Sequence, residues 1–454
     1  MNRQFKAIRR GSHFYLLISL MVYLGLSFFY LLAVPTGESP DEPGHLQCIE
    51  QVSLLGRLPQ IDPPPEGPEW WSRGKIISGR MCYHMPLYYL VAGGLQRVVA
   101  MVVSEPIAYE FPPSNENFGP TPGMFNHPAK ESFWSSGMST HLLALRLLSI
   151  VFGGVTIWAS YTATRRLLPS RPLVALLAAL LTAVWPQYVY LSRSLNNDGL
   201  ATALAVIVLV ILLDVQRPQR FVWASLLAVL AIFTKLSVAF TAVAVLLVWG
   251  IEFWQSPVQR KLYLRYLAIC LGLYAAGFLL LFFTPTLWQH FTQGSRAFAG
   301  LSEAVGEWSY WQEVLRLTAS SGWVRFGWMN VAAPQGHAYV WWGILLGTAV
   351  LGTLGILRGS RQPKIRLQLT IMLIWLLLIG LSYLQVNLNR LQPQFRFALA
   401  AIPILTTLSA VGWLHWLREN ERIAKISIVS VIVSLLFYNV WVIESIIRSA
   451  YHYW

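Results

Sequence analysis

Two adjacent carboxylates, Asp41 and Glu42, follow the first long apolar segment of the chain, within the sequence PDEPGH at residues 40–45. Ionisable groups beside a membrane need water, a charged partner or a function, so such a pair is costly to place there. It suits activation of a hydroxyl nucleophile, with one carboxylate as general base and the other orienting it or binding a cation. The alternative is a solvated turn, in which Pro43 and Gly44 bend the chain and Asp41 caps a helix beginning near His45.

A second acidic site, Asp198, lies in the sequence SLNNDG at residues 194–199, between two apolar segments. Capping of a helix that starts at Gly199 would by itself explain an Asp or Asn at this place. Asn196, Asn197 and Asp198 together supply more polarity than a cap needs. A role in the same site as Asp41 therefore stays open beside the capping role.

Two cations could face an anionic substrate. Lys235 interrupts a long apolar stretch, and Arg396 enters an apolar segment in the sequence QPQFRF at residues 392–397. A guanidinium binds phosphate oxygens through two hydrogen bonds and stays charged at any working pH. The alternatives are a lysine that extends to the membrane surface and an arginine that anchors a helix at the interface.

Weaker candidates lie in the sequence YHMPLYY at residues 83–89, where Pro86 suits the first turn of a helix. His84 could donate to an anion or cap that helix. The nine His are scattered and the three Cys form no cluster, so the sequence predicts no metal site. Cys48 and Cys82 share one long loop, where a disulfide is a hypothesis with free thiols as its alternative.

The elements that hold these residues are membrane helices. The chain of 454 residues is 55% hydrophobic and 12% charged, whereas soluble domains contain about 25% charged residues. Its net charge of +14 is typical of basic cytoplasmic loops and does not require nucleic acid as a partner. Eleven apolar segments are expected to be helical: 14–34, 142–163, 173–190, 200–213, 221–233, 238–251, 266–283, 339–357, 367–384, 397–416 and 426–446.

Loop charge decides how these segments thread the membrane. The apolar stretch 86–103 is interrupted by Gly93, Gly94, Gln96 and Arg97. If it lies on the surface as an amphipathic helix, the inner segments hold more than half of the 34 Lys and Arg residues. The N-terminus is then cytoplasmic, and the loops 35–140 and 285–338 open on the outer face with Asp41, Asp198, Lys235 and Arg396.

The order of these motifs resembles the GT-C superfamily of polytopic glycosyltransferases that use polyprenyl-phosphate-linked sugars. The matching pieces are PDEPGH at 40–45, GRLP at 56–59, HMPLYY at 84–89, RLLS at 146–149, Asn197-Asp198, Thr234-Lys235, FGWM at 326–329 and QFRF at 394–397. Aminoarabinose transferases and protein O-mannosyltransferases are relatives of this kind, and an uncharacterised bacterial branch is the most similar.

The resemblance implies a single all-α transmembrane domain over residues 1–454, a bundle of about 11 helices with amphipathic surface helices in the loop 35–140. It implies a bacterial plasma-membrane enzyme that transfers a hexose or pentose with inversion to a lipid, glycan or protein hydroxyl. Asp41 would be the general base, and Glu42 would orient it or hold the acceptor. Substrate-binding roles would fall to Asn197, Asp198, His84, Tyr88, Lys235, Gln394 and Arg396.

Several points stay open at the level of sequence. The chain has His84-Met85-Pro86 where relatives often have Lys-Pro-Pro or His-Pro-Pro, which weakens the phosphate-binding role of His84. No cofactor is required because phosphate is a good leaving group, with a divalent cation between Asp41 and Asp198 as the alternative. The competing function is a transporter or flippase of a lipid-linked or anionic solute, but transporters usually contain inverted repeats, and none is evident here.

Overall fold

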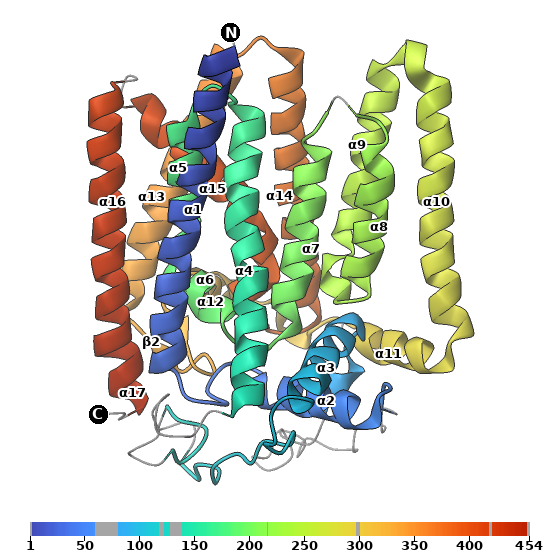
Figure 1. Cartoon of the computed structure of the whole chain (residues 1–454), viewed down its shortest axis with the longest axis vertical. Coiled ribbons are helices and arrows are strands. Elements are labelled where there is room, and N and C mark those ends of the chain that lie inside the picture. The colour runs from blue at the N-terminus through green and yellow to red at the C-terminus, as the bar shows by residue number, and fades with distance from the viewer. Residues whose placement is uncertain are drawn as a thin grey trace.

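The fold is a bundle of long helices, shown in Figure 1 from a computed structural model of the whole chain. The structure describes residues 2–59, 80–117, 122–127, 139–215, 217–296, 300–416 and 420–451. Parts of the expected outer loop 35–140, namely 60–79, 118–121 and 128–138, lie outside the described residues, as do 297–299 of the second loop.

Eight helical segments in the described chain are long and apolar enough to cross a membrane. They belong to α1 (Asn2–Ala33), α4 (Thr140–Leu167), η3 (Leu236–Val238) with α9 (Phe240–Gln255), η4 (Pro257–Gln259) with α10 (Arg260–Phe283), α13 (Gln335–Gly359), α14 (Pro363–Asn389), η6 (Phe395–Ala401) with α15 (Ile402–Trp416), and α16 (Glu421–Trp441) with η7 (Val442–Arg448) and α17 (Ser449–Tyr451). Each crossing needs about 20 apolar residues at 1.5 Å per residue.

The expected helix 173–190 is broken in two. α5 (Pro172–Ala183) and α6 (Pro186–Ser192) form one candidate span that bends by 65°. Pro186 supplies no N–H to the preceding turn and disfavours helical geometry in the residue before it, so the break falls there. Two shorter apolar helices, α7 (Asn197–Leu212) and α8 (Arg220–Ile232), complete the bundle.

Short elements gather at the end of the bundle opposite the N-terminus, which we call the α2 end (Figure 1). They are α2 (Glu42–Leu55), η2 (Arg80–Tyr83), α3 (Leu87–Ala100), α11 (Pro285–Arg296), η5 (Glu303–Gly306), α12 (Trp308–Ser321), and the strands β1 (Arg325–Phe326) and β2 (Val331–Ala332). The strands pair antiparallel, with Arg325 opposite Ala332. α3 lies against α2 at this end, as expected for a helix that does not cross the bundle.

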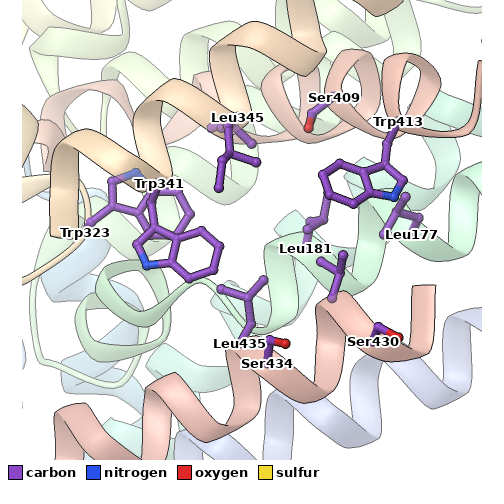
Figure 2. A pocket seen from close by; sticks show the side chains of 12 residues that line it. Leu177, Leu181, Trp323, Trp341, Leu345, Ser409, Trp413, Ser430, Ser434 and Leu435 are labelled. Atoms are coloured by element: carbon purple, nitrogen blue, oxygen red, sulfur yellow. The ribbon is translucent and has the colours of Figure 1, made fainter. Parts of the chain in front are cut away.

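Close helix packing holds the centre of the bundle together. A Cβ atom added at Gly352 of α13 would lie 2.0 Å from the Leu408 carbonyl oxygen of α15, and one at Gly412 would lie 1.9 Å from that of Thr348. Small residues let membrane helices approach in this way. Beside this contact, an apolar cavity of about 270 Å³ opens between α5, α13, α15 and α16, with Trp323, Trp341 and Trp413 in its wall (Figure 2).

Candidate active site

The α2 end brings the expected carboxylates and cations together from four separate parts of the chain. Asp41 is the residue before α2, Asp198 lies in the first turn of α7, Lys235 lies between α8 and η3, and Arg396 lies in η6. All four residues lie at or next to the starts of helices, and these helices start at the α2 end. The helical order of the bundle, and no local motif, therefore assembles the cluster.

Asp41 and Arg396 form the first of two ion pairs. Arg396 Nη2 lies 2.6 Å from Asp41 Oδ2, and the Asp41 side chain is 24% exposed. Asp41 has φ 64° and makes no side-chain capping bond, so the capping role considered for it is wrong. A non-glycine residue in the left-handed region is uncommon and is a marker of functional strain. The carboxylate is thereby directed to Arg396 and away from the helix amides.

Asp198 and Lys235 form the second ion pair, with Lys235 Nζ 2.5 Å from Asp198 Oδ1 and both side chains nearly buried. Both cations also lie over the Phe397 ring, Lys235 Nζ at 4.9 Å and the Arg396 guanidinium carbon at 5.3 Å from its centroid. The two pairs therefore share one aromatic wall. The cap of α7 is Asn196, whose Oδ1 accepts from Gly199 N–H at 3.2 Å, so Asp198 is not used as a cap.

Several polar atoms around these pairs are buried and have no partner among the described residues: Asn197 Oδ1, Asp198 Oδ2, Gln394 Oε1 and Arg396 Nε. An unsatisfied buried polar group costs about 1–3 kcal/mol, so native structures seldom leave several together. Acceptors on Asn197, Asp198 and Gln394, with a donor on Arg396, suit a polar ligand that carries both hydroxyl and anionic groups.

Asp41 is held ionised by its surroundings. Burial would raise the pKa of its carboxyl, but the positive charges of Arg396 and Lys235 outweigh burial and bring that pKa below its ordinary value. Burial lowers the pKa of the Lys235 amine, and the Asp198 carboxylate opposes that effect. A bound anion could take over the stabilising role of either carboxylate.

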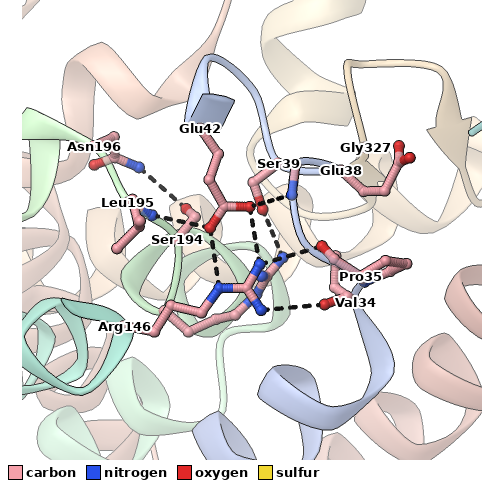
Figure 3. A network of polar contacts seen from close by, with 12 residues as sticks. Val34, Pro35, Glu38, Ser39, Glu42, Arg146, Ser194, Leu195, Asn196 and Gly327 are labelled. Atoms are coloured by element: carbon pink, nitrogen blue, oxygen red, sulfur yellow. Dashed lines mark hydrogen bonds and ion pairs between the residues drawn. The ribbon is translucent and has the colours of Figure 1, made fainter. Parts of the chain in front are cut away.

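Glu42 has a different environment from Asp41, although the two are neighbours. Its side chain is fully buried, and Arg146 donates to both oxygens, from Nε at 3.0 Å and from Nη2 at 2.9 Å (Figure 3). Backbone N–H groups of Gly37 and Leu195 also donate to it, at 3.1 and 3.4 Å. Burial by itself would raise the pKa of the Glu42 carboxyl. The positive charges of Arg146 and Arg193 outweigh burial and bring that pKa below its ordinary value, so the group stays ionised.

Arg146 also ties down the chain that enters the site. Its Nη1 and Nη2 donate to the carbonyls of Val34 and Pro35, at 3.4 and 3.2 Å (Figure 3). Arg193 Nη2 donates to Ser39 Oγ at 2.7 Å from the other side. Both guanidinium groups are buried, and together they hold residues 34–42 in place. Glu42 is thus the centre of a scaffold that positions Asp41.

His84 and Tyr88 lie beside the cluster, around His45. The His84 ring stacks on His45 with centroids 5.8 Å apart, and Tyr88 meets His45 edge-on at 6.2 Å. Burial, with the nearby positive charges of Lys235 and Arg396, brings the pKa of His84 well below its ordinary value. His84 is therefore neutral and can bind phosphate only as a hydrogen-bond donor. Tyr88 is 1% exposed and packs in a small apolar core.

The tautomer of His45 follows from its partner. Tyr89 Oη donates to the Met81 carbonyl at 2.7 Å, so at 2.9 Å it must accept from His45 Nδ1–H. Burial lowers the pKa of His45 to about 4. A neutral imidazole with its proton on Nδ1 keeps Nε2 as an acceptor one helical turn after Asp41. The sequence alone did not single out His45 for a role; its spacing from Asp41 was the available signal.

A disulfide between Cys48 and Cys82 joins α2 to η2, with Cα atoms 5.2 Å apart. It links the helix that follows Asp41 to the segment that carries His84. The described residues contain no group of three or more His, Cys, Asp or Glu side chains arranged to hold a metal ion.

Residues 136–288 match the model of the family described as dolichyl-phosphate-mannose-protein mannosyltransferase. No curated protein sequence matches the chain. The structure is similar to ArnT from Cupriavidus metallidurans bound to undecaprenyl phosphate, with a TM-score of 0.54 and 14% identity over 96% of this chain and 74% of ArnT. It is similar to the Archaeoglobus fulgidus oligosaccharyltransferase, with a TM-score of 0.53 and 13% identity over 97% of this chain and 55% of that protein.

All of these relatives are GT-C glycosyltransferases. The protein has the GT-C fold. The expected fold class, an all-α polytopic membrane bundle, is thereby confirmed, and the chain is an integral membrane protein. The count of about 11 helices stays a prediction.

Within this GT-C fold, sequence reasoning missed Arg193, and it gave Arg146 no role beyond its place in the RLLS motif at 146–149. Both are arginines inside or beside apolar segments, and a buried membrane arginine usually has a dedicated partner. Arg146 stands only four residues into an apolar stretch that begins at Leu142. That position was a usable signal for a buried ion pair, but it did not identify Glu42 as the partner.

Proposed function

We propose that the protein transfers a hexosyl or pentosyl group from a polyprenyl-phosphate donor to a hydroxyl of a lipid, glycan or protein acceptor. The observation that carries the proposal is the cluster of Asp41–Arg396 and Asp198–Lys235, with unpartnered acceptors of Asn197, Asp198 and Gln394 around it. Undecaprenyl phosphate bound to ArnT supports a donor of the same chemical kind.

In this proposal Asp41 is the general base. The acceptor oxygen attacks the anomeric carbon, the acceptor proton passes to an Asp41 oxygen, and the bond from the anomeric carbon to the phosphate oxygen breaks with inversion. The bonding electrons leave with the polyprenyl phosphate, which gains one negative charge. Lys235 and Arg396 stabilise that charge because fixed cations in a site of low polarity act most strongly where charge develops.

The Asp41–Arg396 ion pair implies that the donor binds before Asp41 becomes an effective base. Arg396 pairs with Asp41, so the Asp41 oxygens compete with an incoming phosphate for the guanidinium. A donor phosphate that takes Arg396 leaves Asp41 without its main counter-charge, which raises its proton affinity. The base is then strongest when the donor is in place. Glu42, with its oxygens bound by Arg146 and two backbone amides, serves as a positioning residue.

The proposed setting is the bacterial plasma membrane, with the N-terminus in the cytoplasm and the α2 end outside. The whole chain then forms one catalytic domain, and the loops 35–140 and 285–338 face the extracytoplasmic space. The expected chemistry requires no cofactor. A divalent cation held by Asp41 and Asp198 is the alternative, and addition of a chelator to the assay tests it.

The test is transfer of a radiolabelled sugar from polyprenyl phosphate to a crude envelope acceptor by purified protein in lipid nanodiscs. We expect Asp41→Asn to lower the rate by a factor of about 10²–10⁴, the usual contribution of a general base. Glu313→Gln is the matched control, because Glu313 is a carboxylate paired with Arg316 on α12 at the same end of the bundle. Activity that survives Asp41→Asn would contradict the assignment, and flipping of the donor without transfer would favour a transporter.

A further inference from the structure

The end of the bundle that carries the N-terminus, opposite the α2 end, is called here the N-terminal end (Figure 1). A pocket with charged residues in its wall lies among helix ends there. Its volume is about 240 Å³, and its wall comes from the end of α4, the end of α7, the start of α8 and the connection between α7 and α8. We call it the Arg166 pocket, after the first of the three arginines in its wall: Arg166, Arg217 and Arg220. None of the residues of the candidate active site contributes to it.

The arginines of the Arg166 pocket are only partly neutralised by protein groups. Arg166 Nη2 and Arg217 Nε approach the same oxygen of Asp214, at 4.0 and 3.9 Å. These distances allow attraction but are too long for hydrogen bonds, which need about 2.7–3.2 Å. One carboxylate is thus shared by two guanidinium groups without bonding closely to either.

Arg220 is held in place by a buried contact on its other side. Its Nη2 pairs with Glu252 of α9, and Glu252 also accepts from Tyr263 Oη at 3.0 Å. Arg220 Nε is buried and has no partner in the described part of the chain. Arg166 Nη1 also donates to the Val210 carbonyl and Arg220 Nη1 to the Arg217 carbonyl, so these two guanidinium groups are held in place by the backbone. The three arginines pair with only two carboxylates, Asp214 and Glu252, which leaves one positive charge.

The position of the Arg166 pocket suits a lipid. The candidate membrane span of α4 ends at Leu167, and the apolar helix α7 ends at Leu212, so the pocket lies at the ends of these apolar helices. Trp223 in its wall is 61% exposed, and Ile211 lies beside it. Tryptophan is favoured at the boundary between hydrocarbon and head groups. A ligand here can place an anionic group on the arginines and a hydrocarbon chain along Trp223 and Ile211.

We propose that the Arg166 pocket binds the phosphodiester head group of an anionic phospholipid. Arginine matches phosphate oxygens through paired hydrogen bonds, and basic pockets between membrane helices bind anionic head groups. The site is independent of the proposed transferase reaction, because its residues lie at the other end of the bundle. It would link the packing of α4, α7 and α8 to the lipid composition of the membrane.

The experiment measures phosphatidylglycerol binding to delipidated, full-length protein by native mass spectrometry, with phosphatidylcholine of the same acyl chains as the neutral lipid. We expect preferential retention of phosphatidylglycerol, and a dissociation constant raised about fivefold by Arg217→Gln, since each basic residue near a membrane surface contributes about 1 kcal/mol. Arg217 is 70% exposed, so this variant should fold normally. Arg166→Gln should weaken binding in the same way.

Arg361→Gln is the matched control, because Arg361 is exposed in the connection between α13 and α14 at the same end. It should leave the preference unchanged. An equal loss in Arg361→Gln, or no preference for phosphatidylglycerol over phosphatidylcholine, would overturn the proposal. Inorganic phosphate added as a competitor should displace the lipid only weakly; full displacement at equal concentration would show an anion site without lipid specificity and would also overturn it.

Discussion

Asp41 and Glu42 are adjacent in sequence but belong to opposite environments. Glu42 is fully buried, bound by Arg146 through two hydrogen bonds and by two backbone amides. Asp41 is partly exposed, sits in strained backbone and bonds to a single guanidinium. A carboxylate with every oxygen occupied is poorly suited to accept a substrate proton. The comparison teaches that one residue of an acidic pair can build the site while the other acts in it.

The largest effect on stability should come from neutralising Glu42. Glu42→Gln leaves Arg146 and Arg193 buried without their counter-charge. Loss of one partner of a buried ion pair costs about 3–5 kcal/mol, so the melting temperature in detergent should fall sharply. Asp41→Asn should lower it less, because Asp41 is partly exposed and has a single guanidinium partner. Equal melting temperatures for the two variants would contradict the division of roles.

Removal of the disulfide tests the support around Asp41. The Cys48–Cys82 bridge spans a sequence separation of 34 residues, and the chain-entropy estimate for such a loop is about 3–4 kcal/mol. Replacement of both cysteines by serine should lower stability by about that amount and reduce transfer. Cys270→Ser is the control, because Cys270 is the free cysteine of the described chain and lies in α10. Alkylation of both Cys48 and Cys82 without reductant would exclude the bridge.

Lys235→Gln tests the charge opposite the departing phosphate. Loss of one fixed donor that stabilises a developing anion lowers kcat by about 10²–10³. The effect should appear in kcat more than in KM, because the charge on the phosphate rises as the reaction proceeds. Arg316→Gln, at an exposed ion pair of α12, is the control. A variant that changes only KM would assign Lys235 to ground-state binding.

The smallest effect concerns pH and sharpens the account of Asp41. The pKa of Asp41 is lower in the folded protein than in the unfolded chain. Above the unfolded pKa, Asp41 is therefore ionised and its ion pair with Arg396 stabilises the fold. The ionised base and this stabilisation are both lost as pH falls through the folded pKa. The acid limb of kcat/KM, which reports the free enzyme, should therefore lie below the ordinary Asp range.

The acid limb of the pH profile of kcat should lie at higher pH than that of kcat/KM, because the donor phosphate draws Arg396 away from Asp41. In Arg396→Gln the limb of kcat/KM should move up toward that of kcat. Coincident limbs in the wild-type enzyme would contradict competition between the donor and Asp41 for Arg396.

Much of the architecture followed from the sequence. Apolar runs such as that of α4 had the length of membrane helices, and α3, for which loop charge predicted a surface position, lies beside α2 at the α2 end. The break between α5 and α6 was missed, because the apolar run 173–190 continues through it and only Pro186 marked it. A continuous apolar run does not reveal a bend of 65°.

The candidate site divides in the same way. The sequence by itself determined which side of the bundle carries Asp41, Asp198, Lys235 and Arg396, because the direction of each helix alternates along the chain. Only the tertiary structure decided that Asp41 pairs with Arg396 and that Glu42 belongs to Arg146. Neighbouring carboxylates share every local sequence signal, whereas their partners lie more than 100 residues away. Partner choice depends on helix packing, and that packing is a property of the whole chain.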